Sequence, residues 1–442
     1  MINRLFFISF FMMCIGSNTY AQKIIHCAND ILLQQTAKNN PSLNSPLNQL
    51  NGRLNAAANA RTTSTLPDTV VTIPVVVHII HNNADESIGG ANIPDAQIQS
   101  QIDVLNKDYR RLNADTANAP ASVNAVGADV KFQFCLAQTD PNGDPTNGIT
   151  RTYSSQANFI YPTDETTVKA LSYWPSDQYL NIWVCNLYLY NTTQTLLGIT
   201  QLPSGDTLSG LNATDGNAAT DGVLINYQSF GTTGTLLSQY ALGRTATHEI
   251  GHWFGLFHPW GNYNSGDCTL TDYCDDTPVC GDPFYAAAPS CTDNPAINCS
   301  DRRMIEAYME YSDDGCMNVF TQDQKTRMRL ALILSPRRQA LLSSSHGCNA
   351  AIIPTTTSNS NLSINVFPNP TTDIINVQVT FTGTKNLEYK IYNVLGQFVY
   401  DSKDQNVFSE TKQINLSGYA SGIYFILVTD GVNKIVKRVV KF

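Results

Sequence analysis

The sequence predicts an α/β (α+β) domain with a twisted mixed sheet and one strongly periodic helix, followed by a small all-β sandwich. Two observations predict this architecture. Up to residue 258, β-branched apolar runs surround one strongly periodic helix, which is the pattern of a sheet layered with helices. After residue 362, short β-branched or aromatic runs alternate with turn signals, which is typical of a sandwich. At 442 residues the chain is long enough for both units.

The first unit begins with an apolar, β-branched run over residues 70–80 that suits a buried strand. A helix follows behind Pro94, a residue suited to a first turn, and its apolar residues recur at helical spacing: Ile98, Ile102, Leu105 and Tyr109. Further strands are expected at 130–137, 179–187 and 222–227. Thr321 and Gln324 form a capping box that opens a helix to about residue 334.

The most informative stretch is HEIGHWFGLFH at residues 248–258. His248 and His252 are four residues apart, so a helix places both imidazoles on one face, within reach of one metal ion. Gly255 can adopt a positive φ and end the helix in a sharp turn, which brings His258 back as a third ligand. Three protein ligands with one open position indicate a catalytic zinc site.

Glu249 directly follows the first ligand, where its carboxylate can contact a zinc-activated water as a general base. The competing interpretation of a bare HExxH match is a surface helix with solvated histidines. The additional Gly255 and His258 argue against it, because each serves a separate geometric need. We expect His78 and His81, in or beside the first strand, to be structural or solvated because three ligands are already supplied.

The region after the motif is rich in cysteine and aspartate. Of the 11 cysteines, six lie close together, which predicts a disulfide-stapled loop and leaves a second zinc site as the alternative: Cys268, Cys274, Cys280, Cys291, Cys299 and Cys316. The aspartates and threonines of residues 266–283 offer oxygen ligands at the density that suits calcium. An ordinary polar surface loop remains the alternative to a calcium site.

The termini predict processing and export. Residues 1–21 have a basic residue, a short apolar run and small residues, as in a signal peptide, with an N-terminal membrane anchor as the alternative. Residues 22–67 have the polar composition of a pro-segment. Within it, Cys27 could occupy the open zinc position and hold the enzyme latent, or could be an ordinary disulfide partner. Residues 349–361 are small and polar, as in a linker between domains at 68–348 and 362–442.

Composition excludes some function classes. Charged residues make up 14 % of the chain and the formal net charge is −9, so we expect no nucleic-acid partner. No long apolar segment follows the signal peptide, so we expect no transmembrane segment in the mature protein. Residues 362–442 hold eight Lys or Arg and six Asp or Glu, a change of sign that supports a module boundary near residue 361.

The zinc motif and its surroundings resemble the pappalysin-type branch of the metzincin metallopeptidases over most of residues 70–348. The matching stretches are 243–247, 258–261, 268–278 and 308–316. The resemblance implies that Met309 forms a hydrophobic floor beneath the zinc and that Tyr311 stabilises the oxyanion. It also implies disulfides between Cys268 and Cys299 and between Cys291 and Cys316, with Cys274 left to pair with Cys280. Related enzymes further suggest calcium near Asp272, Asp275 and Thr277, and latency through a cysteine placed as Cys27 is.

The C-terminal unit is expected to contain strands at 374–381, 387–394, 397–401, 423–429 and 435–440. It resembles a sorting domain of the type IX secretion system, through VFPNP at 366–370, LSGYASGIY at 416–424 and a basic tail. The resemblance implies the type IX machinery as a partner and an extracellular location, either released or attached to the cell surface. The alternative is a carbohydrate- or protein-binding sandwich, because this fold hosts many functions.

Together these features predict a secreted zinc-dependent endopeptidase that cleaves extracellular protein or peptide substrates and is made as a latent precursor. Zn²⁺ is the expected cofactor, together with Ca²⁺. A secreted adhesin or binding protein with a vestigial peptidase domain is the alternative, and the complete set of three histidines and Glu249 argues against it. A zinc hydrolase acting on a non-peptide substrate is a third possibility.

Overall fold

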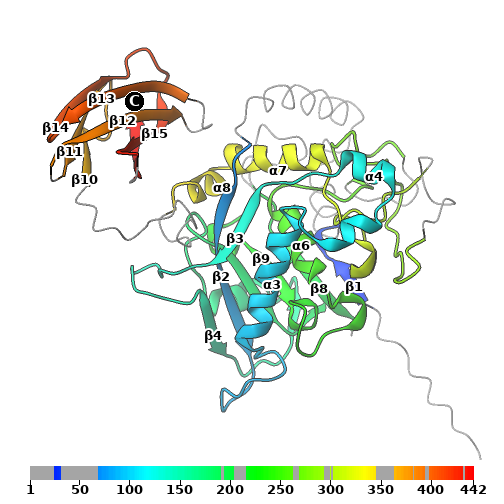
Figure 1. Ribbon diagram of the computed structural model, residues 1–442. Coiled ribbons are helices and arrows are strands. Elements are labelled where there is room, and N and C mark those ends of the chain that lie inside the picture. Colours follow the sequence, from blue (N-terminus) through cyan, green and yellow to red (C-terminus); the bar gives the residue numbers. More distant parts are fainter. Residues whose placement is uncertain are drawn as a thin grey trace, which may run out of the picture.

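The structure is a computed structural model, and it describes residues 24–30, 68–190, 194–203, 216–261, 268–292, 299, 302–344, 363–381, 383–393, 398–431 and 434–442. The expected signal peptide at 1–21 and linker at 349–361 lie outside the described residues. Of the expected pro-segment, only residues 24–30 are described. Two units with separate hydrophobic cores are present, and the C-terminal one is coloured orange to red in Figure 1.

The larger unit is built on a nine-stranded mixed sheet with the order β3-β2-β6-β9-β8-β7-β5, in which β1 pairs with β8 and β4 with β2. Most pairs are parallel, whereas β8 runs antiparallel to β9 and β7. The strands are β1 Ile24–Cys27, β2 Val71–His81, β3 Phe132–Leu136, β4 Ile149–Tyr153, β5 Phe159–Tyr161, β6 Leu180–Cys185, β7 Leu187–Leu189, β8 Thr195–Thr200 and β9 Val223–Asn226.

The long helices cover one face of this sheet. Helices α3 (Asp95–Asp108) and α6 (Arg244–Trp253) pack on it and bury the main core, which includes Ile98, Ile182 and Ile250 (Figure 1). A second cluster, with Trp183 and Leu224 among its members, lies on residues that alternate with those of the main core. Because both faces are buried, the central strands read as continuous apolar runs.

Helix α7 (Gln322–Leu334) begins at the predicted capping box, in which the Thr321 side chain accepts from the Gln324 amide and the Gln324 side chain accepts from the Thr321 amide. Helix α8 (Pro336–Leu341) follows directly. The remaining helices of this unit are short: α4 Ala121–Val126, α5 Glu165–Ala170, and the 3-10 turns η2 Ala114–Asn118, η3 Ala218–Thr220, η4 Tyr227–Ser229, η5 Ser238–Tyr240 and η7 Asp314–Cys316.

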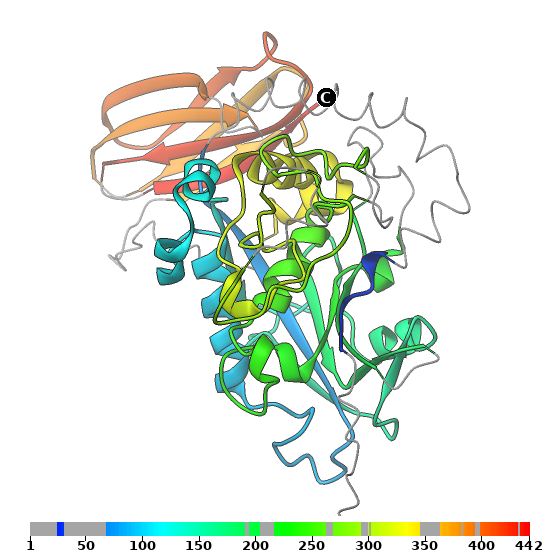
Figure 2. The ribbon, with the colours of Figure 1, turned by 90° about the vertical axis from the view of Figure 1, so that its right-hand side faces the viewer.

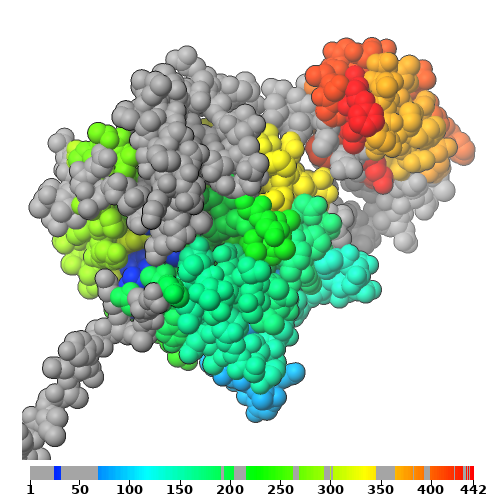
Figure 3. Space-filling model, turned by 180° about the vertical axis from the view of Figure 1, so that it is seen from behind, coloured from blue at the N-terminus to red at the C-terminus, as the bar shows by residue number. Residues whose placement is uncertain are grey.

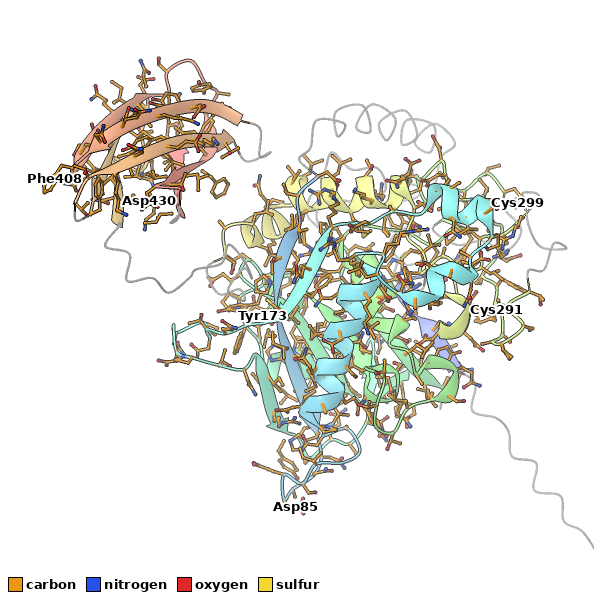
Figure 4. The ribbon with its side chains drawn as sticks, in the orientation of Figure 1. Asp85, Tyr173, Cys291, Cys299, Phe408 and Asp430 are labelled. Atoms are coloured by element: carbon orange, nitrogen blue, oxygen red, sulfur yellow. A yellow bond between two sulfur atoms is a disulfide. The ribbon has the colours of Figure 1, made fainter. Side chains whose placement is uncertain are left out.

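The C-terminal unit consists of a three-stranded sheet with the order β10-β11-β14 and a four-stranded sheet with the order β13-β12-β15-β16. All of the strand pairs within these two sheets are antiparallel. Its core is aliphatic and aromatic, whereas Phe408 lies at a loop on its exposed surface (Figure 4). The strands are β10 Ser363–Phe367, β11 Ile374–Thr380, β12 Lys385–Asn393, β13 Phe398–Val407, β14 Glu410–Asn415, β15 Gly422–Thr429 and β16 Lys434–Lys441.

The α/β class, the following all-β sandwich and the main helices agree with the sequence predictions. The sequence patterns did not identify strands β1, β4, β5, β7, β8, β10 and β14. Among these, β8 matters most, because it contacts α6 and pairs with β1. Within the described part of the chain, no helix is long and apolar enough to cross a membrane.

Candidate active site

The histidine motif lies where the sequence analysis predicted it, on α6 and the turn that follows. The helix begins after Gly243, whose φ is 77°, and ends before Gly255, whose φ is 87°. Both angles lie in the left-handed region, where a side chain is disfavoured. The turn at Gly255 redirects the chain, so that His258 returns to the helix face that carries His248 and His252.

The three imidazoles meet at one point. Their Nε2 atoms lie 3.2 Å apart for His248 and His258, 3.1 Å for His252 and His248, and 3.0 Å for His252 and His258. Cys27 joins them, since its sulfur and the three imidazoles place ligand atoms within 4.8 Å of one another. This is the one group of three or more His, Cys, Asp or Glu ligand atoms that the described residues bring close enough for a single ion.

In His248 and His252, the hydrogen bond made by Nδ1 determines whether Nε2 carries a proton or a lone pair. Nδ1 of His248 donates to the Tyr308 carbonyl at 2.7 Å, and Nδ1 of His252 donates to the Leu256 carbonyl at 2.8 Å. Burial lowers the pKa of both rings well below the usual value, with the neighbouring His258 as a second cause. The Nε2 atoms of His248 and His252 therefore present lone pairs to each other, an arrangement that is repulsive unless a cation lies between them. The donor set thus fits zinc.

Glu249 lies beside this cluster and is completely buried. Burial raises the pKa of its carboxyl to about 8. Oε2 accepts a hydrogen bond from the Thr200 hydroxyl at 2.9 Å, whereas the buried Oε1 has no nitrogen or oxygen partner among the described residues. The Cys27 thiol also donates a hydrogen bond to the Glu249 carboxyl, so the carboxyl faces both the metal-ligand cluster and Cys27.

Met309 packs against α6, and Tyr311 lies beside two of the histidine rings. A Cβ placed on Gly251 of α6 would lie 2.6 Å from the Met309 sulfur, so the fully buried Met309 packs directly against the zinc helix. The ring of Tyr311 lies 4.9 Å from that of His258 and 5.9 Å from that of His248, measured between centroids. Tyr311 therefore places its hydroxyl at the edge of the cluster.

A buried ionic network holds the N-terminus of α6. The guanidinium of Arg244 pairs with Asp108 of α3, donates to Asp115 at 2.8 Å and donates to the Tyr308 hydroxyl at 2.8 Å. The carboxylate of Asp314 accepts from the backbone amide of Arg244 at 3.2 Å, so it caps the helix. The helix that carries two histidines is thereby fixed to the segment that carries Met309 and Tyr311.

The described residues of the expected pro-segment lie beside β8 and the histidine cluster. Strand β1 pairs in parallel with β8, with Cys27 opposite Gly198, and this places the Cys27 sulfur at the histidine cluster. In the space-filling view, the described pro-segment residues form a blue patch among green residues (Figure 3). His26 donates to, or accepts from, the Tyr240 hydroxyl at 2.7 Å and lines a pocket together with Glu310 and Met317.

Asp30 is a site residue that the sequence analysis missed. Its Oδ1 accepts from Nδ1 of His258 at 2.6 Å, and its Oδ2 lies 3.1 Å from the Tyr311 hydroxyl and 3.4 Å from Nε1 of Trp260. The third histidine thus receives a carboxylate partner where the first two have backbone carbonyls. The available signal was its position three residues after Cys27, which the latency interpretation did not use.

The cysteine-rich loop partly follows the expected pairing. The structure joins Cys268 to Cys299 and Cys291 to Cys316, and the two labelled cysteines in Figure 4 each belong to one of these bonds. It does not join Cys274 to Cys280, contrary to the local pair that we expected. The two thiols have different neighbours: Cys274 lies at the Asp272 backbone, whereas Cys280 packs with Trp260 and Tyr311.

The residues expected to hold calcium are only partly brought together. The Thr277 hydroxyl lies 2.9 Å from Oδ1 and 2.8 Å from Oδ2 of Asp272, whose carboxylate also accepts from the Cys274 amide. Burial raises the pKa of Asp272 to about 7. Asp275 is exposed, and its amide donates to Asp323 on α7.

His78, expected to be structural, is buried between Asn181 and the Thr150 and Ser172 hydroxyls.

Two parts of the sequence match known protein families. Residues 163–333 match the family model described as pregnancy-associated plasma protein-A, and residues 365–441 match the secretion system C-terminal sorting domain. An extracellular metalloprotease of Pyricularia oryzae is 30 % identical over 279 residues, which cover 62 % of this chain and 79 % of the relative. The chain belongs to the pappalysin family of metallopeptidases.

Solved pappalysin structures agree with this membership. Mature mirolysin of Tannerella forsythia with a cleaved peptide is 41 % identical, with a TM-score of 0.53 over 62 % of this chain and 97 % of that one. Promirolysin of the same organism is 37 % identical, with a TM-score of 0.59 over 72 % of this chain and 97 % of that one. This pappalysin is therefore a secreted zinc metallopeptidase made as a latent precursor, with a C-terminal sorting domain. Nothing in the comparisons supports the adhesin alternative.

Proposed function

We propose that this pappalysin cleaves peptide bonds with His248, His252 and His258 as zinc ligands and Glu249 as general base. The observation that carries the proposal is the convergence of three histidine Nε2 atoms 3.0 to 3.2 Å apart, with Glu249 adjacent. When bound there, zinc supplies Lewis acidity that polarises a carbonyl and lowers the pKa of water. The substrates are extracellular proteins or peptides, in keeping with the secreted location.

The protein side chains then divide the proton and charge handling between them. Glu249 takes a proton from the attacking water through its available Oε1 and later returns it to the leaving amine. The Tyr311 hydroxyl, at the edge of the histidine cluster, donates to the oxygen that becomes negative. Met309 contributes packing beneath the zinc helix and takes no part in proton transfer.

Latency follows from the position of the pro-segment. Cys27 lies with its sulfur among the three imidazoles, so its thiolate is suited to fill the fourth metal position. Strand β1 occupies the side of β8 on which an extended substrate could pair. The ordinary-disulfide alternative for Cys27 receives no support, since Cys27 is a thiol in the structure. Removal of residues 22–67 would then expose both the metal and the edge.

The flanking segments place the enzyme outside the cell. We propose residues 1–21 as the signal peptide, 68–348 as the peptidase domain, 349–361 as the linker and 362–442 as the sorting domain. The sorting domain implies the type IX secretion machinery as a partner. Its match over residues 365–441 agrees with the two-sheet unit that begins at β10.

A calcium ion near Asp272, Asp275 and Thr277 is a second proposal for this chain. Asp272 and Thr277 already contact each other, and one oxygen of the nearby Asp276 is buried without a partner among the described residues. A hard cation would favour these oxygens. Calcium titration of the chelator-treated protein tests the site: we expect a raised unfolding temperature in wild type and none in Asp272→Asn. Equal effects on both proteins would exclude these ligands.

Glu249→Ala in the activated enzyme tests the peptidase mechanism. We expect zinc content to remain equal to that of wild type, because the ligands are untouched, while casein hydrolysis falls by several decades. A zinc chelator should abolish the wild-type activity and added zinc should restore it. Retained hydrolysis by the purified variant would contradict the general-base role, and activity insensitive to the chelator would contradict the zinc site.

A further inference from the structure

Strand β8 contacts the general base of the proposed mechanism, and this contact is specific. Thr200, at the end of β8, is buried with 1 % of its surface exposed. Its hydroxyl lies 2.9 Å from Oε2 of Glu249 and 2.8 Å from the backbone oxygen of the same residue. One side chain on the sheet edge therefore contacts both the carboxylate and the backbone of the base.

Gly198 provides a second contact from the same strand. A Cβ at this position would lie 2.6 Å from Cγ and 2.7 Å from Oε1 of Glu249, closer than real Cβ contacts allow. The backbone of β8 therefore passes directly against the Glu249 side chain. Gly198 and Thr200 are two residues apart on the strand, so both face α6. The φ of Gly198 is not in the left-handed region, so the requirement for glycine here is one of space.

The two contacts have complementary effects on the carboxylate. Thr200 holds Oε2, whereas Gly198 limits the space on the side of Oε1. Among the described residues Oε1 has no nitrogen or oxygen partner, and the Cys27 thiol, which belongs to the expected pro-segment, donates the other side-chain hydrogen bond to this carboxyl. A base that must receive a proton in one direction benefits from a side chain held in one rotamer, because misplacement by about 1 Å costs rate.

We propose that Thr200 and Gly198 are positioning residues that hold Glu249 in the orientation for proton transfer. This inference rests on the proposed role of Glu249 as general base. The hydroxyl of Thr200 anchors Oε2 by hydrogen bonding, and the bare backbone at Gly198 makes room for the rest of the side chain. Neither residue is a proposed metal ligand, and neither carries a proton in the reaction.

Thr200→Val, which removes the hydroxyl at nearly constant shape, and Thr200→Ser, which keeps it, test this role. Each variant is made in the full-length chain and assayed after activation. We expect Thr200→Val to lower kcat roughly ten- to hundredfold, the range for a lost hydrogen bond to a charged group, with KM within about twofold. Thr200→Ser should retain kcat within about threefold of wild type.

The matched control is Thr195→Val, the same substitution at another buried position of β8. We expect it to leave kcat unchanged. Gly198→Ala is the second variant and should lower kcat by at least as much as Thr200→Val, because its Cβ overlaps the Glu249 side chain. Binding of a peptide hydroxamate, measured by calorimetry, should weaken in Thr200→Val and Gly198→Ala and stay unchanged in Thr195→Val, while the zinc content of all three stays at the wild-type value.

Three results would overturn the proposal. They are an unchanged kcat in Thr200→Val, a loss in Thr200→Ser as large as in Thr200→Val, and a loss of zinc that accounts for the lost activity. None of them bears on the mechanism itself, which depends on Glu249→Ala. If Glu249→Ala is inactive and Thr200→Val is fully active, the general base stands and the positioning role of β8 is wrong.

Discussion

The hydroxyl of Tyr311 lies 3.1 Å from Oδ2 of Asp30, a residue of the expected pro-segment. The other oxygen of the same carboxylate accepts from His258, and the Tyr311 hydroxyl also lies 3.2 Å from the Cys27 carbonyl. In the precursor, the proposed oxyanion donor and the third proposed zinc ligand are thus both engaged by a segment that contains Cys27. The latent state is therefore stabilised by the Asp30 carboxylate as well as by the Cys27 thiol.

Asp30→Asn should weaken latency. The substitution keeps the size of the side chain and removes its charge, so the bonds to His258 and Tyr311 weaken from about 1.5–3 kcal/mol each, the range for a charged partner, to about 0.5–1.5 kcal/mol, the range for a neutral one. We expect the uncleaved precursor to hydrolyse a small peptide roughly tenfold or more faster than the wild-type precursor. The activated enzymes should be identical, because the segment has been removed. Asp68→Asn, at an exposed carboxylate, is the control and should remain latent.

Cys27→Ala should remove latency more completely. Without its sulfur the fourth metal position is open to water and substrate, even though β1 can still pair with β8. We expect activity in the uncleaved precursor, measured with a peptide too short to depend on the covered edge. Cys185→Ala removes another buried thiol, outside the site, and should leave the precursor inactive. A Cys27→Ala precursor as inactive as wild type would show that strand pairing alone suffices.

Tyr311→Phe should slow the chemical step of the activated enzyme. The phenyl ring keeps the packing against His258 and removes only the donor, so we expect kcat to fall roughly 10²-fold with KM little changed. Steady-state kinetics with a fluorogenic peptide measure both constants. Tyr153→Phe, at an exposed tyrosine of β4, should match wild type. A rise in KM at constant kcat would assign Tyr311 to substrate binding in place of transition-state stabilisation.

Arg244→Met should destabilise the peptidase domain. Arg244 and Asp108 are both buried, and removing the guanidinium leaves the Asp108 and Asp115 carboxylates without their cation. Breaking such a buried pair costs about 3–5 kcal/mol, whereas Arg110→Met, at the partly exposed pair with Asp129, should cost about 1 kcal/mol or less. Urea denaturation followed by tryptophan fluorescence compares the two variants. Equal midpoints would show that the network does not stabilise the zinc helix.

The elements with strong local patterns were predictable. The zinc helix, its glycine turn and the capping box of α7 depend on residues within a few positions of one another. Strand β8 was missed because TLLGIT is short, does not alternate and has a glycine in its interior, a residue that weakens a strand pattern. Its strand conformation comes from its neighbours β9 and β1, so no signal in its own sequence identifies it.

Figure 2 shows a strand pairing that local sequence patterns could not predict. There β1, drawn in dark blue, lies beside the green strands of the peptidase domain, although about 170 residues separate the paired positions Ile24 and Thr195. The cysteine pairing has the same origin. Sequence spacing could not exclude a Cys274–Cys280 bond, but the fold directs the two thiols to different neighbours.

By itself, the sequence determined the identity of the three histidines, the adjacent Glu249 and the two-unit organisation, because helical periodicity and turn chemistry are local properties. Only the tertiary structure decided which groups surround them. Asp30 reaches His258 across 228 positions of the chain, and Thr200 reaches Glu249 across 49. Such contacts depend on which strand forms the sheet edge and in which register the pro-segment pairs with it, and both are set by packing of the whole domain.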